Sequence, residues 1–138
     1  MTASDVSDDA LKLAAENVES TGADVTLVKS DLFENVAGEY DIITANPPYI
    51  PSAEVDKLDD FVKREPRLAL DGGADGLDVY RSVRASIAEH LKVGGVFLTE
   101  IGYDQAEAVS ALFGDLGAVE VIRDLEGHDR VVKVRRDV

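Results

Sequence analysis

Residues 40–49 read YDIITANPPY, in which a mostly apolar run is followed by Asn46, two consecutive prolines and Tyr49. The run predicts a strand over Tyr40–Ala45, bounded by Gly38 and by Pro47. Each proline fixes its own φ angle and lacks an N–H group, and Pro47 pushes the preceding Asn46 into an extended conformation. We therefore expect a stiff segment beyond the strand, with the Asn46 side-chain oxygen and backbone carbonyl oxygens as hydrogen-bond acceptors.

Strands and helices alternate along the rest of the chain. Ser7, followed by two acids, predicts the start of a helix, and Gly22 predicts its end. Further helices are predicted near residues 54–62, along 77–91 and after Asp104 as N-cap, and further strands at 25–28, 96–101, 119–122 and 130–134. Residues 50–76 otherwise read as a long loop, and the turn 126–129 suits an antiparallel hairpin. This order predicts an open α/β sheet, mostly parallel, with an antiparallel C-terminal hairpin.

The 138 residues predict a single domain over 1–138, with enough apolar residues for one core. No apolar run reaches the roughly 18 residues of a membrane span, so no membrane partner is expected, and no signal peptide is recognisable. The chain has no cysteine, which excludes disulfides, zinc–thiolate sites and thiol nucleophiles and fits a cytoplasmic location. His90 and His128 are isolated, so no metal site is expected.

The chain is strongly acidic, with 28 Asp and Glu against 14 Lys and Arg and a formal net charge of −14. A surface of this sign repels phosphate backbones, because nucleic-acid binding depends on Lys and Arg. Nucleic acid is therefore disfavoured as a substrate, although a local basic patch could override the net figure. The simpler interpretation of the charge is a solvated acidic surface.

Ligands of open α/β sheets bind beyond the carboxyl ends of the strands. The positions that meet this condition are Asp5, Asp31, residues 46–49 and residues 100–102. The acceptors of residues 46–49 suit a planar substrate with an NH₂ group, because two acceptors can hold both N–H bonds. An amide nitrogen is a poor nucleophile, so most of the catalysis would come from aligning it with an electrophilic methyl group and stabilising its developing charge. The alternative is a rigid turn that only closes a strand.

The residues around this segment make the pattern more specific. Asn-Pro-Pro-Tyr after an apolar strand resembles the signature of class I methyltransferases that act on amino groups of adenine or on glutamine amides. The further stretches are NPPYIP (46–51), EP (65–66), AL (69–70), DGGADGL (71–77), YR (80–81), LKVGG (91–95), EIG (100–102) with Gln105, and Asp124 with DRV (129–131). Together they resemble the HemK/PrmC family of release-factor glutamine methyltransferases over essentially the whole chain. The resemblance implies a Rossmann-like class I methyltransferase sheet, S-adenosylmethionine as cofactor, and methylation of the glutamine in the Gly-Gly-Gln motif of peptide chain release factors.

The resemblance also implies which residues bind the substrate. Asn46 and the Pro47 carbonyl would bind the glutamine amide, and Tyr49 would pack beside it, so these three are the candidate catalytic residues. Pro48 and Glu65 complete the implied substrate-binding set, with Glu65 on a loop over the substrate.

A second implied set binds the cofactor. Asp5 would hold the ribose hydroxyls, Asp31 would lie near the adenine amino group with Leu32 beside the ring, and Asn46 would border the same ligand. From the residues alone, Asp5 is equally a solvated acid or a helix cap, and the alternative for Asp31 is a turn acid. The glycines of residues 72–76 are expected to shape their loop rather than to contact a ligand.

The chain departs from the family at its N-terminus, because Met1–Asp5 aligns with the second strand of the family's catalytic domain. We therefore expect a sheet without the usual first strand, without the glycine-rich cofactor loop and without the helical domain that docks the release factor. Two strand edges would be left unpaired, so the chain must pair them directly, leave a gap or borrow a strand from another copy as a homo-oligomer. Much weakened cofactor binding by this chain alone is a further expectation.

Three functions stay open from the sequence. Glutamine methylation of release factors is the leading one. A methyltransferase for an amino group of a nucleic-acid base shares the tetrapeptide but would need a basic surface. The third is an inactive, truncated domain that folds as an oligomer or with a partner.

Overall fold

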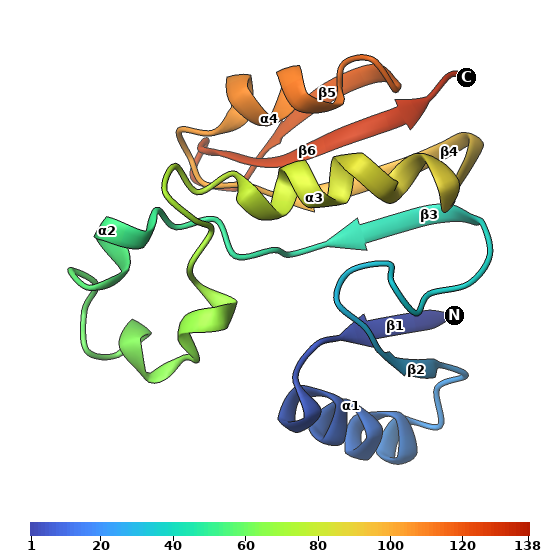
Figure 1. The fold of residues 1–138 in the computed structure, drawn as a ribbon, viewed down its shortest axis with the longest axis horizontal. Helices are drawn as coiled ribbons and strands as arrows, with labels where there is room; N and C mark the ends of the chain where they lie inside the picture. Colours follow the sequence, from blue (N-terminus) through green and yellow to red (C-terminus); the bar gives the residue numbers. More distant parts are fainter. The chain divides into compact units, whose positions relative to one another are not determined.

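The computed structural model describes residues 1–138, which form two compact units, Met1–Gly38 and Glu39–Val138. Each unit contains its own β-sheet, two-stranded in the N-terminal unit and four-stranded in the C-terminal unit (Figure 1). The strand pairings described below lie within one unit or the other, and the arrangement of the two unpaired strand edges stays a prediction. A single domain over 1–138 and a homo-oligomer through sheet edges stay predictions.

The N-terminal unit is a short βαβ element. β1 (Thr2–Asp5) and β2 (Thr26–Lys29) pair in parallel, and α1 (Asp8–Thr21) connects them. Both predicted helix ends are confirmed: Ser7 is the N-cap and accepts a backbone N–H of the first turn at 3.3 Å, and Gly22 ends the helix with φ +66°.

Four strands form the sheet of the C-terminal unit, in the order β3-β4-β6-β5. They are β3 (Tyr40–Ala45), β4 (Leu91–Glu100), β5 (Gly117–Arg123) and β6 (Asp129–Arg136). β3 and β4 are parallel, whereas β6 is antiparallel to both of its neighbours. The α/β class, the mostly parallel strand directions and the antiparallel C-terminal hairpin are therefore confirmed.

The boundary between the long helix and β4 differs from the prediction. Pairing with β3 begins at Leu91, and residues 92–95 form a bulge before regular pairing resumes. The helix predicted along 77–91 is accordingly shorter, because α3 (Asp78–Ser86) ends in the 3₁₀ turn η3 (Ile87–Glu89). Leu91 continues the apolar spacing of the helix because it is buried in the same core, but it belongs to the strand.

Residues 50–71 form an excursion from the sheet, closed at its base by a β-bridge between Ile50 and Asp71. The excursion contains α2 (Ser52–Val55), η1 (Val62–Arg64) and η2 (Arg67–Ala69). The single helix predicted near 54–62 is wrong, because α2 ends at Val55 and turns follow it up to η1. Pro66 favours an extended conformation at Glu65 (ψ 147°), so η1 stops there.

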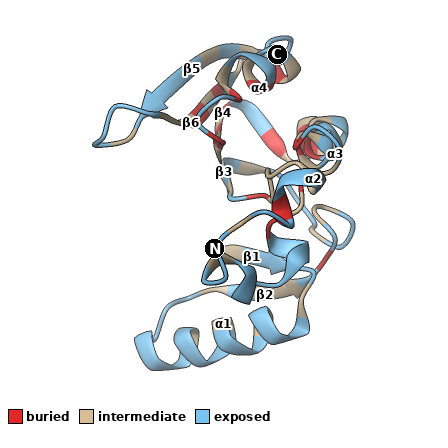
Figure 2. Cartoon of the chain, turned by 90° about the vertical axis from the view of Figure 1, so that its left-hand side faces the viewer, coloured by how far each residue is buried: buried red, intermediate tan, exposed pale blue.

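The core of the C-terminal unit lies between the sheet and two helices, α3 and α4 (Ala106–Phe113), which lie side by side on one face of the sheet (Figures 1 and 2). Buried strand residues alternate with more exposed ones, as a sheet with one covered face requires. The Phe97 ring of β4 packs on the Phe113 ring of α4, with centroids 5.2 Å apart. Val109 and Phe113 of α4 and Leu116 just beyond its end are buried, whereas Leu112 is half-buried.

No helix of the chain combines the length and the apolar character that crossing a membrane requires.

α4 begins after Gln105, which is its N-cap, so the prediction of Asp104 as the cap is wrong by one residue. Gln105 makes no side-chain cap bond to the helix, because its amide group is bound elsewhere.

Candidate active site

The candidate acceptor segment, Asn46–Tyr49, leaves the carboxyl end of β3. Pro47 is buried at the strand end, whereas Asn46 is exposed. β3 pairs in parallel with β4 up to Ala45, which lies opposite Thr99. The segment therefore begins at the edge of the sheet where both strands end, which is the edge at which α/β sheets bind ligands.

The Tyr49 side chain is held by the last residue of β4. Its hydroxyl donates to Glu100 Oε1 at 3.0 Å, and the Tyr80 hydroxyl donates to the Glu100 carbonyl oxygen at 2.7 Å. Burial, and then the hydrogen bond to Glu100, raise the pKa of Tyr49 above its ordinary value of 10.0, whereas Arg130 opposes part of the shift. The phenol of Tyr49 therefore keeps its proton at neutral pH and remains a hydrogen-bond donor.

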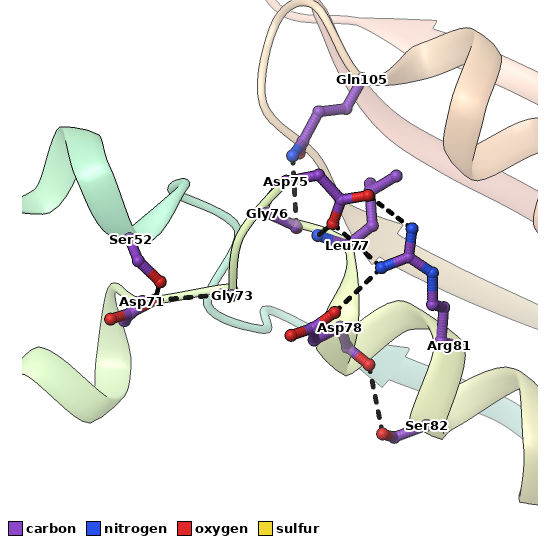
Figure 3. Close-up of polar contacts among 10 residues, drawn as sticks. All are labelled: Ser52, Asp71, Gly73, Asp75, Gly76, Leu77, Asp78, Arg81, Ser82 and Gln105. Carbon is purple, nitrogen blue, oxygen red and sulfur yellow. Dashed lines mark hydrogen bonds and ion pairs between the residues drawn. The ribbon is translucent and has the colours of Figure 1, made fainter.

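The backbone of Tyr49 is held by Gln105. Gln105 Nε2 donates to the carbonyl oxygens of Tyr49 at 2.9 Å and of Gly76 at 3.3 Å, the second of which is drawn in Figure 3. Its Oε1 accepts the N–H of Gly102 at 2.9 Å. The Tyr49 carbonyl, one of the acceptors expected in this segment, is thus engaged within the protein.

The glycine-rich loop of residues 71–77 is fixed at both ends (Figure 3). At one end, Asp71 Oδ1 accepts from the Ser52 hydroxyl at 2.6 Å, the main reason that its pKa is lowered, and from the Gly73 N–H at 3.0 Å. At the other end, Arg81 of α3 donates to Asp75 at 2.9 and 2.5 Å, which lowers the pKa of Asp75 to about 2. Glycines of this loop adopt positive φ angles, which supports the prediction that they shape it.

Glu65 lies on the excursion and lines a hollow there. The hollow has a volume of about 270 Å³, and its other lining residues are Val55, Asp56, Lys63, Arg67 and Leu70. Arg67 donates to Asp56 at 2.7 Å and to Asp71 at 3.0 Å, so ion pairs fix this wall of the hollow. A role of Glu65 over the substrate stays a prediction.

Three of the four expected cofactor-binding residues, Asp5, Asp31 and Leu32, lie in the N-terminal unit near the carboxyl edge of its sheet, whereas Asn46 belongs to the acceptor segment of the other unit. Asp5 is the last residue of β1, opposite Lys29, and its Oδ1 accepts the Ser7 N–H at 2.8 Å, so it also stabilises the turn that precedes α1. Asp31 is exposed just beyond β2. Leu32 has φ +49°, a conformation that residues with side chains rarely adopt.

Two residues that hold Tyr49 had no assigned role in the sequence prediction. Glu100 and Gln105 belong to the stretches that carry the family resemblance, but the sequence alone assigns neither of them a role. A carboxylate that ends an apolar strand is a usable signal for Glu100, because such a group needs a partner. Gln105 offers no such signal, since its contacts reach residues 56 and 29 positions away.

The fold and this site together define a methyltransferase-type α/β protein. The structure of a methyltransferase from Pyrococcus furiosus matches with a TM-score of 0.74 and 18% identity, covering 99% of this chain and 62% of that one. A ribosomal protein L11 methylase from Lactobacillus delbrueckii subsp. bulgaricus matches with a TM-score of 0.68 and 20% identity, covering 99% of this chain and 57% of that one. The chain belongs to the methyltransferase small domain family, whose sequence model matches residues 1–74.

Two relatives are more similar in sequence. A protein of Caulobacter vibrioides, named release factor glutamine methyltransferase, is 46% identical over 134 residues, which are 93% of this chain and 46% of the relative. A protein of Geobacter sulfurreducens with the same name is 44% identical over 127 residues, 89% of this chain and 45% of the relative. The chain spans about half the length of the curated relatives that it matches.

Proposed function

We propose that this protein is an S-adenosylmethionine-dependent methyltransferase for the side-chain amide nitrogen of glutamine in the Gly-Gly-Gln motif of peptide chain release factors. The relatives named release factor glutamine methyltransferase support the choice of substrate. The observation that carries the chemistry is the acceptor segment Asn46–Tyr49, which leaves β3 at the carboxyl edge and is held through both the side chain and the backbone of Tyr49.

In this proposal the acceptor segment binds the glutamine amide. The Asn46 side-chain oxygen and the Pro47 carbonyl oxygen accept the two N–H groups, and the ring of Tyr49 packs beside the amide plane. Two fixed acceptors leave the nitrogen lone pair facing the methyl donor, and they stabilise positive charge as it develops on nitrogen. The amide nitrogen gains the methyl group and loses one proton. Pro48 stiffens the segment, and Glu65 contributes from the excursion.

The N-terminal unit would hold the cofactor. S-adenosylmethionine, when bound, supplies the electrophilic methyl group. Asp5 and Asp31 fit this role, since carboxylates at the carboxyl ends of two parallel strands can accept from ribose hydroxyls and from an adenine amino group. The positive φ of Leu32 also fits, because strained backbone outside glycine is concentrated at ligand-binding sites.

The test is methyl transfer from radiolabelled S-adenosylmethionine to a purified release factor. We expect label in the release factor, no label when its Gly-Gly-Gln is changed to Gly-Gly-Ala, and no label in DNA or RNA. Transfer to nucleic acid and not to the release factor would establish the nucleic-acid alternative. No transfer to any substrate, with no binding of the cofactor, would favour the inactive domain.

A variant of the acceptor segment sharpens this test. Asn46→Ala should lower the transfer rate by about 100-fold or more, because it removes an acceptor aimed at the reacting group. Asn46 is exposed, so the free energy of unfolding should change by less than about 0.5 kcal/mol. The matched control is Asn17→Ala on the exposed side of α1, which should leave the transfer rate unchanged.

A further inference from the structure

Gln105 is a buried amide at the meeting point of three segments that are distant in the sequence. Its side chain contacts the end of the acceptor segment at Tyr49, the glycine-rich loop at Gly76, and the turn after β4 at Gly102. Only 8% of its surface is exposed. The substrate and cofactor roles proposed above do not use this side chain.

The chemistry of its partners fixes the orientation of the amide. Two carbonyl oxygens can only accept, so the NH₂ group must face Tyr49 and Gly76. The Gly102 N–H can only donate, so the side-chain oxygen must face it. Both hydrogens of Nε2 are thereby used, and a group that lacks a donor cannot replace it.

The glycine-rich loop packs closely against the backbone of Tyr49, on the side where Gln105 binds it. A Cβ atom at Gly76 would lie 2.3 Å from the Tyr49 carbonyl oxygen and 2.8 Å from Gln105 Nε2. A Cβ atom at Gly72 would lie 2.8 Å from the Tyr49 Cα. At these two positions the loop therefore packs so closely against the backbone of Tyr49 that no side chain fits between them.

We propose that Gln105 is the positioning residue of the acceptor segment. One end of this segment is fixed because Ala45 is paired within the sheet. The other end is fixed by the hydrogen bond from Gln105 to the Tyr49 carbonyl. Two prolines lie between these ends and fix their φ angles, so a displacement of Tyr49 is transmitted to Asn46 and to the Pro47 carbonyl. The catalytic meaning of this role rests on the proposed function, whereas the structural meaning does not.

The variant that tests the proposal is Gln105→Glu. A carboxylate has the same shape and can still accept the Gly102 N–H, but it presents an oxygen where two carbonyl oxygens need a donor. We expect kcat for methyl transfer to a release factor to fall about 10- to 100-fold, because small misplacements of reacting groups have effects of this size. The Kd of S-adenosylmethionine, measured by calorimetry, should change less than kcat, because three of the four expected cofactor residues, Asp5, Asp31 and Leu32, lie on the N-terminal unit. The matched control is Glu107→Gln, the reverse change at an exposed position of the same helix, with no expected effect.

A second measurement does not require activity. The Ile50 N–H donates to the Leu70 carbonyl at 3.0 Å, and its hydrogen exchange should become at least about tenfold faster in Gln105→Glu, while exchange of Phe97 in β4 should stay unchanged. Gln105→Met, an apolar residue of similar length, should give the same pattern. If both variants unfold as a whole, Gln105 supports the entire unit and the proposal is wrong.

The two proposals fail in different ways. A wild-type protein that methylates no substrate contradicts the proposed function, and hydrogen exchange at Ile50 then decides alone on the role of Gln105. An active wild type with a folded Gln105→Glu variant of unchanged kcat and unchanged exchange overturns the positioning role and leaves the function intact.

Discussion

Tyr49 is held at two points, and the two have different consequences. The hydrogen bond from its hydroxyl to Glu100 fixes the ring, whereas the bond from Gln105 to its carbonyl fixes the chain direction. A ring that packs beside a planar amide must not swing away, so the hydroxyl contact matters even though the hydroxyl itself does no chemistry in the proposed reaction. The raised pKa of Tyr49 keeps this donor protonated in the neutral range.

Tyr49→Phe tests the hydroxyl contact. The change leaves Glu100 without its donor, so we expect the free energy of unfolding to fall by about 1–2 kcal/mol. Glu100→Gln is the matched partner variant, because its amide oxygen can still accept from Tyr49 and the loss should be smaller. Urea unfolding at pH 7 measures both, and equal losses in the two variants would show that this hydrogen bond is not the cause.

At the scale of elements, the glycine-rich loop joins the excursion to α3 and encloses the acceptor segment. Its glycines are needed for two physical reasons: some adopt a positive φ angle, and some lie so close to neighbouring backbone that a side chain would not fit. Gly76 requires both, since it has φ +76° and contacts the Tyr49 carbonyl. Gly127, in the hairpin turn, has φ +86° and open space around it, so it requires only the first.

Because of this difference, Gly127→Ala and Gly76→Ala form a matched pair of substitutions. Gly127→Ala should cost about 1–2 kcal/mol of stability, the cost of a left-handed conformation for a residue with a Cβ. Gly76→Ala should cost at least about 2 kcal/mol more, because the added Cβ also overlaps backbone that cannot move away. Chemical denaturation of both variants gives the comparison. A Gly76→Ala variant as stable as Gly127→Ala would mean that the loop can shift away from Tyr49.

The ion pair between Asp75 and Arg81 anchors the same loop to α3 and should be sensitive to acid. The pKa of Asp75 is about 2 in the folded chain, below its ordinary value of 3.8, so folding favours the ionised form. The stabilisation is therefore fully present above about pH 4 and disappears as the pH falls toward 2. Asp75→Asn should be less stable than the wild type at pH 7, and the gap should narrow at pH 3. Asp59→Asn on the excursion serves as control, and a gap independent of pH would contradict the assignment to ionisation.

For the whole molecule, the dominant electrostatic feature is the net charge of −14. Repulsion among like charges opposes compact structure, and salt screens it, with a Debye length of about 10 Å at 0.1 M. The thermal midpoint at pH 7 should therefore rise with NaCl between 20 and 500 mM, by roughly 3–6 °C for each kcal/mol of repulsion removed. The control is the same titration at pH 4.3, the isoelectric point of the sequence, where the effect should nearly vanish. Equal salt effects at both pH values would exclude net charge as the cause.

The elements that could be predicted from sequence are those whose cause is local. Ser7 and Gly22 fix the ends of α1 through a side-chain cap and a left-handed residue. The apolar run before Asn46 and the two prolines after it determine where β3 ends and the acceptor segment begins. The spacing of apolar residues and the turn residues also predicted the C-terminal hairpin and the α/β class, because both signals act within a few positions of the chain.

The tertiary structure decided what depends on contacts between distant residues. Leu91 joined β4 although its spacing continued the helix, because pairing with β3 supplied its backbone hydrogen bonds. Gln105 acquired its place at the site through carbonyls 56 and 29 positions away, and no local pattern encodes such contacts. The sequence by itself thus determined which residues can hold an amide, and the tertiary structure decided what holds those residues in place.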